Sequence, residues 1–378
     1  MTTTKKDPVL VVLQLTGAND PLNTVIPFTN PLYRDNRPNV GIPAERVLPI
    51  NDELGFHPNM GPVKRLWDQG KVAIVQGIGY ENSPRSHFRS MDIWHTCEPD
   101  KVGTEGWLGK VIRDLDPSGD NVLKGVNFGQ GLPRALALRG VPVTSVSDLE
   151  SYGVLTDVPG VDSPAERDRM LDIFARIYAP TLGAGPVMDY LSQTGRNVLD
   201  GADIIKTAPQ KYSSSVEYAD TPIARALKSV AQVYLADLGT QIFYTQHGSF
   251  DTHFNQQPMH SRLWTDVGQA IGDFFDDLRQ HNAGDNLIMM LFTEFGRRVK
   301  DNGTGTDHGA GGIAFVVGEP VQGGLYGMYP SLKPEDLTQG DLAPNYDFRG
   351  FYSSIVEQWL GLDPAPIVGG NFEQMKFL

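Results

Sequence analysis

The stretch VLVVLQLTGAND, residues 9–20, decides the fold class of this chain. Its first seven residues are almost entirely apolar, and so short a run without alternation is typical of a strand that is buried on both faces. A glycine and polar residues follow at once, as they do where a parallel strand ends at a ligand-binding edge. The stretch therefore predicts a parallel strand over residues 9–15, with a loop directly after it that can carry functional side chains.

Four further apolar runs have the same character, and they lie at residues 72–78, 241–245, 287–293 and 313–317. Helical periodicity is found at residues 59–69, 87–96, 164–178, 222–238, 260–281 and 348–360. Buried strands that alternate with helices predict an α/β fold, in which a mostly parallel central sheet is covered by helices on both faces. Ser163, Pro164 and Glu166 predict a capped helix start at residue 164.

The length of 378 residues, 40% of them hydrophobic, is enough for one large domain with a substantial core. We expect a single domain over residues 1–378 with a helical insertion at about 160–215. Residues 114–158 are rich in glycine, proline and valine without clean periodicity, which predicts short strands and loops inserted in the main fold.

Charge and cysteine content exclude several classes of protein. The chain has 45 acidic and 32 basic residues, a net charge of −13, so nucleic acid is a poor partner. A single cysteine, Cys97, rules out an intrachain disulfide and a cysteine-rich zinc site. The apolar run at 9–15 is too short to span a membrane. No export signal is recognisable, which predicts a cytoplasmic protein unless a leader was removed; the oligomeric state stays open.

Carboxylates and imidazoles gather directly after the predicted strands and in a late glycine-rich loop. Six of them are candidate metal ligands: Asp20, Asp251, His253, Glu294, Asp307 and His308. Parallel strands end at one edge of a sheet, so we expect these side chains to converge. Carboxylates brought together raise one another's pKa, and a cation relieves that cost. Mixed oxygen and nitrogen ligands suit one or two divalent ions, namely Zn²⁺, Mn²⁺ or Ca²⁺.

Each candidate also has a structural alternative. Asp20 precedes a proline and could form a turn, Asp251 could cap a helix, and Asp307 could form a turn among glycines. Glu294 could pair with a neighbouring arginine. The metal site would lose its basis if the carboxyl groups of Asp20, Asp251 and Glu294 lay far apart or were salt-bridged to separate arginines. Four other histidines are interpreted as structural or surface residues: His57, His95, His247 and His281. His260 is interpreted as a helix residue with a weaker claim to the site.

The candidate catalytic residues are Ser86, His87 and Arg297. Ser86 and His87 stand at the start of the helix predicted over residues 87–96, where free backbone N–H groups favour a phosphate or sulfate. Plain helix capping is the alternative for Ser86. Arg297 follows a predicted strand and could stabilise charge on a transferred group.

Six segments give the chain a family resemblance: LGFHPNMGPVKRLWDQGKVAIVQGIGY, SPRSHFRSMDIWHT, GWLGKVIRDL, GSFDTHFNQ, MLFTEFGRRVKDNGTGTDHGAGG and DFRGFYSSIVEQWLGLD. With these segments the sequence resembles the DUF1501 family, which its fold places in the alkaline phosphatase and sulfatase superfamily. The resemblance implies an alkaline phosphatase-like fold. It implies metal ligands at Asp20, Glu294 and the pair Asp251 and His253, a nucleophile or its counterpart at Ser86, and the late histidine at His308.

Two features depart from the superfamily pattern. Phe295 follows Glu294 where the superfamily often has Asp-His, so a ligand of a two-metal site is lost. Asp251 and His253 are closer together than is usual. The segment Cys97-Glu-Pro-Asp-Lys101 resembles the Cys-x-Pro-x-Arg segment of sulfatases but ends in lysine and lies well after Ser86, so we read it as coincidence.

These features together predict a metal-dependent hydrolase that uses a serine nucleophile on small anionic substrates, namely phosphate or sulfate esters. The alternative is a catalytically inactive binding or scaffold protein that keeps the fold and at most a structural metal. A nucleotide-dependent oxidoreductase is rejected, because the glycines at 303–312 follow a charged segment and not a strand.

Overall fold

The computed structural model describes residues 6–149, 163–177, 201 and 204–378. Its centre is a nine-stranded sheet in the order β11-β5-β10-β9-β1-β8-β6-β7, with β12 paired to β5. The strands are β1 (Val9–Leu15), β5 (Val72–Gly79), β6 (Gly125–Phe128), β7 (Thr144–Val146), β8 (Ile242–His247), β9 (Leu287–Phe292), β10 (Gly312–Val317), β11 (Gly324–Tyr326) and β12 (Tyr346–Asp347). β10 is antiparallel to both of its neighbours, and every other pairing in this sheet is parallel.

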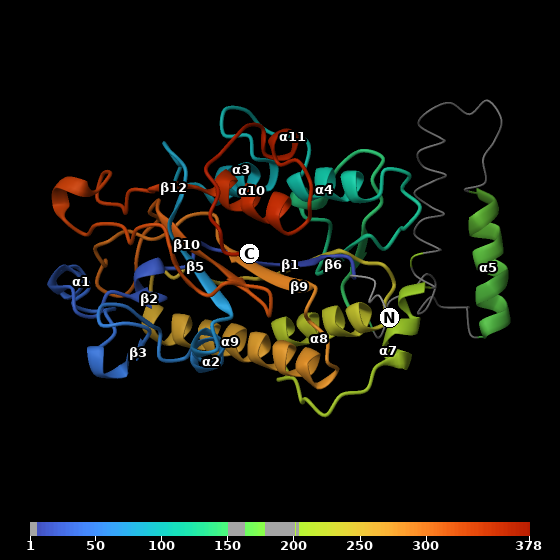
Figure 1. Ribbon diagram of the computed structural model, residues 1–378, viewed down its shortest axis with the longest axis horizontal. Helices are drawn as coiled ribbons and strands as arrows, with labels where there is room; N and C mark the ends of the chain where they lie inside the picture. The colour runs from blue at the N-terminus through green and yellow to red at the C-terminus, as the bar shows by residue number, and fades with distance from the viewer. Residues whose placement is uncertain (1–5, 150–162, 178–200, 202–203) are drawn as a thin grey trace.

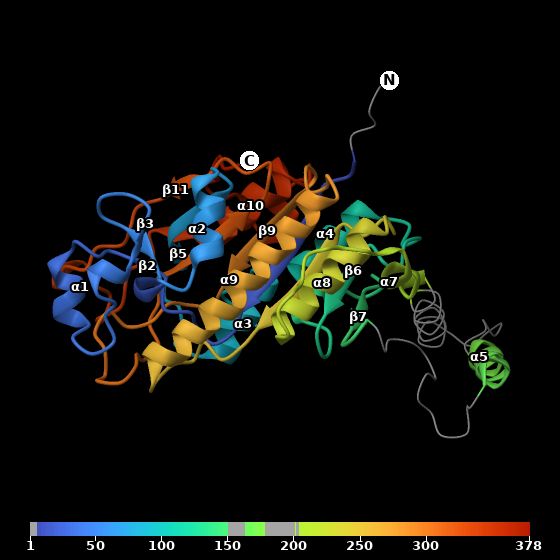
Figure 2. The same ribbon diagram turned by 90° about the horizontal axis from the view of Figure 1, so that it is seen from below.

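Helices cover both faces of the sheet (Figure 1). One face carries α2 (Gly61–Asp68), α8 (Pro222–Leu235) and α9 (Gln256–Gln280), and Figure 2 shows α9 running between the other two. The opposite face carries α3 (His87–Thr96), α4 (Trp107–Leu115), α10 (Phe348–Gln358) and α11 (Ala365–Val368). The side chains of β1 alternate between the two cores: Val11 and Leu13 pack towards α9, and Leu10 and Val12 pack towards α10.

Smaller elements lie around this core. β2 (Val25–Ile26), β3 (Leu48–Pro49) and β4 (Gly55–Phe56) form a separate antiparallel sheet near α1 (Pro31–Asn36). The 3₁₀ turns are Pro21–Asn23, Ala44–Arg46, Arg134–Leu136 and Pro334–Asp336. α5 (Pro164–Ile177) and α7 (Thr207–Lys211) are the described helices of the predicted insertion, and its status as part of a single domain stays a prediction.

The fold confirms the predicted α/β class and the mostly parallel sheet between two layers of helices. The five predicted strands are β1, β5, β8, β9 and β10, and the predicted helix over 87–96 is α3 to the residue. The Ser163 hydroxyl accepts from the Glu166 amide at 3.3 Å and donates to the Glu166 carboxylate at 2.8 Å, which confirms the capped start of α5. None of the helices in the described part of the chain is long and apolar enough to cross a membrane.

The region predicted as loops and short strands contains more of the main fold than the sequence indicated. β6 pairs in parallel with β8, and β7 with β6, so these strands extend the central sheet. Both are short, with four and three residues, which leaves too little apolar run for a periodicity argument. Residues 150–158 of that region lie outside the described residues.

The topology brings five central strands to one edge. β1, β5, β8 and β9 all end there, because they run parallel. β10 begins there, because it runs the other way. Loops that leave four strands and the loop that enters the fifth therefore meet at the same edge of the sheet.

Candidate metal centre

Four side chains from three loops meet at this edge, and we call them the His/Asp cluster: His87, Asp251, His253 and His308. His87 is the first residue of α3, which follows β5. Asp251 and His253 follow β8, and His308 precedes β10. Nε2 of His308 lies 2.9 Å from Nε2 of His87 and 2.9 Å from Nε2 of His253. Oδ1 of Asp251 lies 3.1 Å from Nε2 of both His253 and His308, and 3.4 Å from Nε2 of His87.

The second nitrogen of each imidazole is held by an acceptor outside the cluster. Nδ1 of His308 lies 3.0 Å from the Arg85 carbonyl oxygen. Nδ1 of His87 lies 2.7 Å from the Glu294 carboxylate, and Nδ1 of His253 lies 3.0 Å from the Asp307 carboxylate. Carbonyl and ionised carboxylate oxygens only accept, so the proton of each ring is assigned to Nδ1. The three Nε2 atoms then present lone pairs to the centre of the cluster.

This donor set fits a divalent cation. Ligands about 2.0–2.1 Å from zinc at tetrahedral corners lie about 3.3 Å from one another, close to the separations in the cluster. The Arg297 guanidinium supplies one positive charge beside Oδ1 of Asp251, and a bound cation would supply another among the imidazole lone pairs. Metal-bound histidines ordinarily donate their other N–H to a carboxylate or carbonyl, as all three do here. The ligand atoms of His87, Asp251 and His308 lie within 4.8 Å of one another, and His253 adjoins the last two.

Glu294 lies behind His87 and not among the converging ligand atoms. It is fully buried, and its Oε1 accepts from the Gly17 amide at 2.9 Å as well as from His87. Its Oε2 accepts from the Thr293 hydroxyl at 2.9 Å. The hydrogen bond to Glu294, opposed in part by burial, raises the pKa of His87. Glu294, predicted as a ligand, is therefore placed to orient a ligand and to make it more basic.

Asp307 has a comparable position behind His253, and it also accepts from the Asn302 side chain at 3.2 Å. The hydrogen bond from His253 lowers the pKa of Asp307. Of the six predicted ligands, Asp251, His253 and His308 share the cluster, and Asp307 and Glu294 support it.

Asp20 is not brought to the cluster. Its carboxylate pairs with the Arg37 guanidinium through contacts of 2.5 and 3.0 Å, and both side chains are fully buried. It also accepts from the Leu22 amide at 3.2 Å and so caps the turn over Pro21–Asn23. Burial works against its charge, but Arg37 lowers the pKa of Asp20 below its ordinary value. The turn-forming alternative describes Asp20 correctly, because a buried carboxylate needs a cationic partner and Arg37 supplies one.

The Arg297 side chain also makes structural hydrogen bonds. Its guanidinium is fully buried and donates to the carbonyl oxygens of Ala18 and Gly17 at 2.8 Å and of Thr306 at 2.9 Å. Nη2 lies 2.5 Å from Oδ1 of Asp251. All three of its nitrogens are engaged, so it positions Asp251 and the loops and does not face a transferred group. Asp20 and Asp251 are thus paired with separate arginines and Glu294 lies behind His87, so the predicted convergence of these three carboxylates does not occur. The candidate centre depends instead on the three imidazoles around Oδ1 of Asp251, the oxygen that also meets Arg297.

Ser86 lies beside the cluster, directly before His87. It is exposed, and its side chain makes no capping hydrogen bond to α3. At the far end of the same helix, Cys97 is buried, and burial raises the pKa of its thiol well above the ordinary value. A buried thiol with a raised pKa is a poor nucleophile, which supports reading the sulfatase-like segment as coincidence.

Two residues of the site were not anticipated in these roles. His87 was predicted as catalytic, yet it supplies one of the converging nitrogens. Phe295 is buried, and its ring lies 5.0 Å from that of His87 and 5.2 Å from that of His308. It holds the two imidazoles from one side by ring packing. The position of Phe295 shortly after a predicted strand could have indicated a role in the site. The sequence pattern was interpreted only as the replacement of a metal ligand by an apolar residue.

Two histidines outside the candidate ligand set, His95 and His260, make buried contacts within the fold. His95 is buried against Gln14, with its Nε2 2.8 Å from Oε1. His260 is buried on α9, with its Nε2 3.0 Å from Oδ1 of Asn19. Neither contact belongs to the His/Asp cluster.

A family model described as "Protein of unknown function (DUF1501)" matches residues 194–364. The resemblance to the DUF1501 family is thereby confirmed over this part of the chain. The matched part includes Asp251, His253 and His308, whereas His87 lies outside it. The family description assigns no activity, and no curated protein matches the sequence.

Solved structures similar to this chain include the C-terminal periplasmic domain of EcEptC from Escherichia coli in complex with zinc, with 10% identity, a TM-score of 0.39 and coverage of 98% of this chain and 84% of that one. A protein of the alkaline phosphatase superfamily from Vibrio parahaemolyticus has 9% identity, a TM-score of 0.43 and coverage of 98% and 70%. BT1596, a 2-O GAG sulfatase, has 10% identity, a TM-score of 0.37 and coverage of 98% and 76%.

Proposed function

We propose that this protein is a metal-dependent hydrolase of phosphate or sulfate esters. The observation that carries the proposal is the convergence of three imidazole Nε2 atoms on Asp251 Oδ1, with each Nδ1 anchored behind. The cation would be held by the His/Asp cluster. A set rich in imidazole favours Zn²⁺ or Mn²⁺ over Ca²⁺, which prefers oxygen ligands alone.

Partial exposure of the cluster favours a reactive site over a purely structural one. The side chains of His87, Asp251, His253 and His308 are 28, 43, 38 and 21% exposed, so a small anionic ester can reach them. Structural zinc sites are closed, whereas catalytic sites keep a position open to substrate. A divalent cation, when bound, acts as a Lewis acid towards an anionic ester.

Ser86 is the candidate nucleophile, because its exposed hydroxyl lies at the start of α3 next to His87 and is not used as a cap. Its oxygen would attack the phosphorus or sulfur atom, the bond to the alcohol oxygen would break, and the serine proton would pass to the departing alcohol. Water would then hydrolyse the serine ester, which restores the serine and releases phosphate or sulfate. Arg297 would act by fixing Asp251 in place, since its donors are occupied. Phe295 and Glu294 would keep His87 in the orientation that the cluster requires.

A binding or scaffold protein with a structural ion is the second candidate. Two observations favour it: Phe295 stands where the superfamily often has a further ligand, and the guanidinium of Arg297 is turned towards backbone carbonyls. In this alternative the cluster would bind a cation and support no turnover.

The deciding experiment combines metal analysis with a turnover panel. Protein purified without chelator or nickel affinity is analysed for bound metal, and is then assayed on aryl phosphate mono- and diesters and aryl sulfates with added Zn²⁺ or Mn²⁺. The variants are His308→Ala, Asp251→Asn and Ser86→Ala, and His281→Gln at the end of α9 is the matched control outside the cluster. We expect His308→Ala and Asp251→Asn to lose metal and turnover, and Ser86→Ala to lose turnover alone.

Each other result has a definite meaning. Metal binding that His308→Ala abolishes, with no ester hydrolysed by the unaltered protein, would establish the scaffold alternative. Turnover that survives in His308→Ala and Asp251→Asn would overturn the assignment of the cluster. Turnover that survives only in Ser86→Ala would remove the serine from the mechanism and keep the metal centre.

A further inference from the structure

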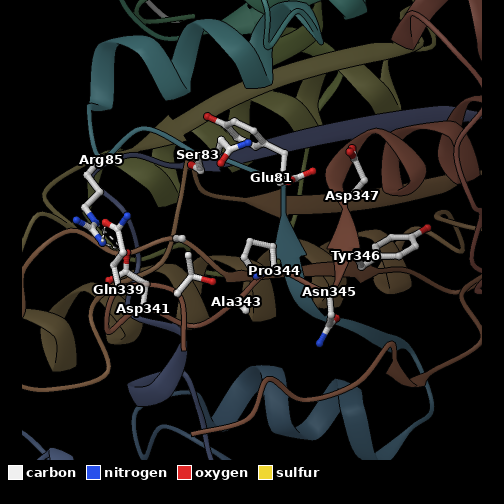
Figure 3. Close-up of a pocket in the computed structure, with 14 residues that line it drawn as sticks. Glu81, Ser83, Arg85, Gln339, Asp341, Ala343, Pro344, Asn345, Tyr346 and Asp347 are labelled. Carbon is white, nitrogen blue, oxygen red and sulfur yellow. Dashed lines mark hydrogen bonds and ion pairs between the residues drawn. The ribbon is translucent and has the colours of Figure 1, made fainter. Parts of the chain in front are cut away.

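A pocket of about 850 Å³ lies beside the segment that leads into α3 (Figure 3). Two of its lining residues tie it to the cluster directly. Arg85 lines the pocket with its side chain, and its carbonyl oxygen accepts from Nδ1 of His308. Ala310 lines the pocket two residues after His308. A substrate whose ester group reached the cluster would therefore extend its remaining part into this space.

The pocket is acidic. Its lining includes Glu81, Asp341 and Asp347, against the single basic residue Arg85. Arg85 is already paired with Asp341, at 2.7 Å, and Figure 3 shows the two together. Asp347 caps α10 and pairs with Arg349 at 2.7 Å. The exposed Glu81 therefore adds a negative charge at the pocket wall. An anionic group other than the reacting ester would be repelled here.

The lining also holds a buried carboxylate that two arginines engage. Asp341 is 2% exposed, and its Oδ2 takes the hydrogen bond from Arg85. Its Oδ1 is buried as well and lies 3.9 Å from Nε of Arg298. Asp341 therefore leaves the exposed Glu81 as the lining acid that a ligand can meet.

Amide side chains also line the pocket. Asn82, Gln339 and Asn345 line the same space and offer both N–H donors and carbonyl acceptors. Hydroxyl groups donate and accept at once, so they match a wall of carboxylates and amides better than an apolar or an anionic group does.

We propose that this pocket binds the alcohol part of the substrate, and that this part carries no negative charge and is rich in hydroxyl groups, as a neutral sugar or an amino sugar is. The inference rests on the proposed function for the ester end alone. It makes the substrate class a phosphate or sulfate ester of a polyhydroxy compound without a further acidic group, with Glu81 selecting against acidic sugars.

The test uses three phosphate esters that differ in one group: glucose 1-phosphate, glucuronic acid 1-phosphate and glucosamine 1-phosphate, or the matching sulfates. Unaltered protein should have a kcat/KM for the neutral sugar at least about tenfold above that for the glucuronate, because one added anion would lie near the pocket acids. Glu81→Lys should bring the ratio of kcat/KM for the neutral sugar ester to kcat/KM for the glucuronate ester closer to one. Glu53→Lys, which makes the same change of charge at an exposed position outside the pocket lining, should leave it unchanged.

A binding measurement separates this inference from the proposed function. Saturation-transfer NMR with methyl glucoside and methyl glucuronide needs no turnover. The unaltered protein should transfer saturation to the neutral glycoside alone, and Glu81→Lys should transfer it to the glucuronide as well. Hydrolysis of aryl esters with no discrimination among the three sugars would overturn the pocket assignment and leave the hydrolase standing.

The remaining outcomes are equally distinct. A kcat/KM for glucosamine 1-phosphate as low as that for glucuronic acid 1-phosphate would overturn the role of Glu81, because its charge attracts an ammonium group. Binding of the neutral glycoside without hydrolysis of any ester would support the pocket and overturn the hydrolase.

Discussion

His308 is the residue on which the geometry of the candidate site depends most. Its Nε2 lies close to His87, His253 and Asp251, and its Nδ1 is fixed by the carbonyl of Arg85. Rotation of this ring would break four contacts together. Such anchoring fixes which nitrogen carries the proton, and only a ring fixed in that way can present a lone pair reliably to a cation.

At the same scale, Glu294 should control metal affinity through His87. Glu294→Gln removes the charged acceptor and lets the new amide face His87 with either end, so the imidazole loses its fixed tautomer. We expect zinc affinity to fall about 10- to 100-fold, the range for loss of such supporting partners. Competition with a chromophoric chelator measures it. Glu53→Gln is the surface control, and unchanged affinity in Glu294→Gln would show that Glu294 does not orient a ligand.

Asp20 should affect stability and not metal binding. Asp20→Asn leaves the buried Arg37 without its counter-charge, so the free energy of unfolding should fall by about 3–5 kcal/mol. Urea unfolding monitors this loss, and metal content is measured on the folded fraction. The control is Asp68→Asn, which breaks the exposed pair with Lys64 and should cost under about 1 kcal/mol. A loss of metal at unchanged stability would return Asp20 to the list of ligands.

At the scale of elements, close approach of loops sets the site. Gly17 follows β1 with a φ of +111°, and its amide donates to Glu294. A Cβ added there would lie 2.6 Å from the backbone nitrogen of Asp251. The loops after β1 and β8 can therefore touch only because residue 17 has no side chain.

Gly17→Ala should consequently disturb both stability and metal binding. Strain in the left-handed region together with the clash should cost about 1–3 kcal/mol or more, and displacement of Asp251 should weaken zinc binding. The matched control is Gly61→Ala at the start of α2, where an added Cβ meets nothing within 4 Å. Thermal unfolding and zinc titration of both variants provide the comparison. Equal stability of the two proteins would contradict the close approach.

The antiparallel direction of β10 determines on which edge of the sheet His308 lies. Because β10 runs against β9 and β5, its entering loop reaches the edge at which its neighbours end. His308 lies in that loop and is bridged to Arg297 across an isolated antiparallel pair. A parallel strand at this place would have carried the same loop to the opposite edge of the sheet.

At the scale of the whole molecule, buried neutral histidines should set acid stability. Burial lowers the pKa of His57 to about 3 and of His95 and His260 to about 4. The unfolded chain binds these protons near pH 6.5, and the folded chain does so only near pH 4 or below. Stability is therefore fully present above about pH 6.5 and is lost as the pH falls towards 4.

Urea unfolding between pH 7.5 and 5 tests this dependence. Each of the three histidines contributes up to about 1.4 kcal/mol per pH unit within the window. His95→Gln should reduce the slope of unfolding free energy against pH by up to one proton. The lowered pKa values of Asp251 and Asp307 place their titration below this range. A flat profile between pH 7 and 5 would contradict the assignment of these histidines as neutral and buried.

Most of the sheet could be predicted from local pattern. β1, β5, β8, β9 and β10 are apolar on both faces, and such runs have few other stable positions in a folded chain. β6 and β7 were not predicted as strands of the central sheet, because three or four residues are too few to show a hydrophobic periodicity. The placement of polar residues directly after the central strands was equally visible, and this pattern brought Asp251, His253 and His308 into the prediction.

By itself the sequence determined which strands are buried and that acids and histidines would gather where they end. Only the tertiary structure decided which of these groups meet: Asp20 turned to Arg37, Arg297 turned to backbone carbonyls, and His87 turned into the cluster. The physical reason is that a carboxylate serves equally well as a metal ligand, a cap or half of an ion pair. The choice among these depends on contacts between residues far apart in the chain, such as that of Gly17 with Glu294 across 277 residues, which no local pattern encodes.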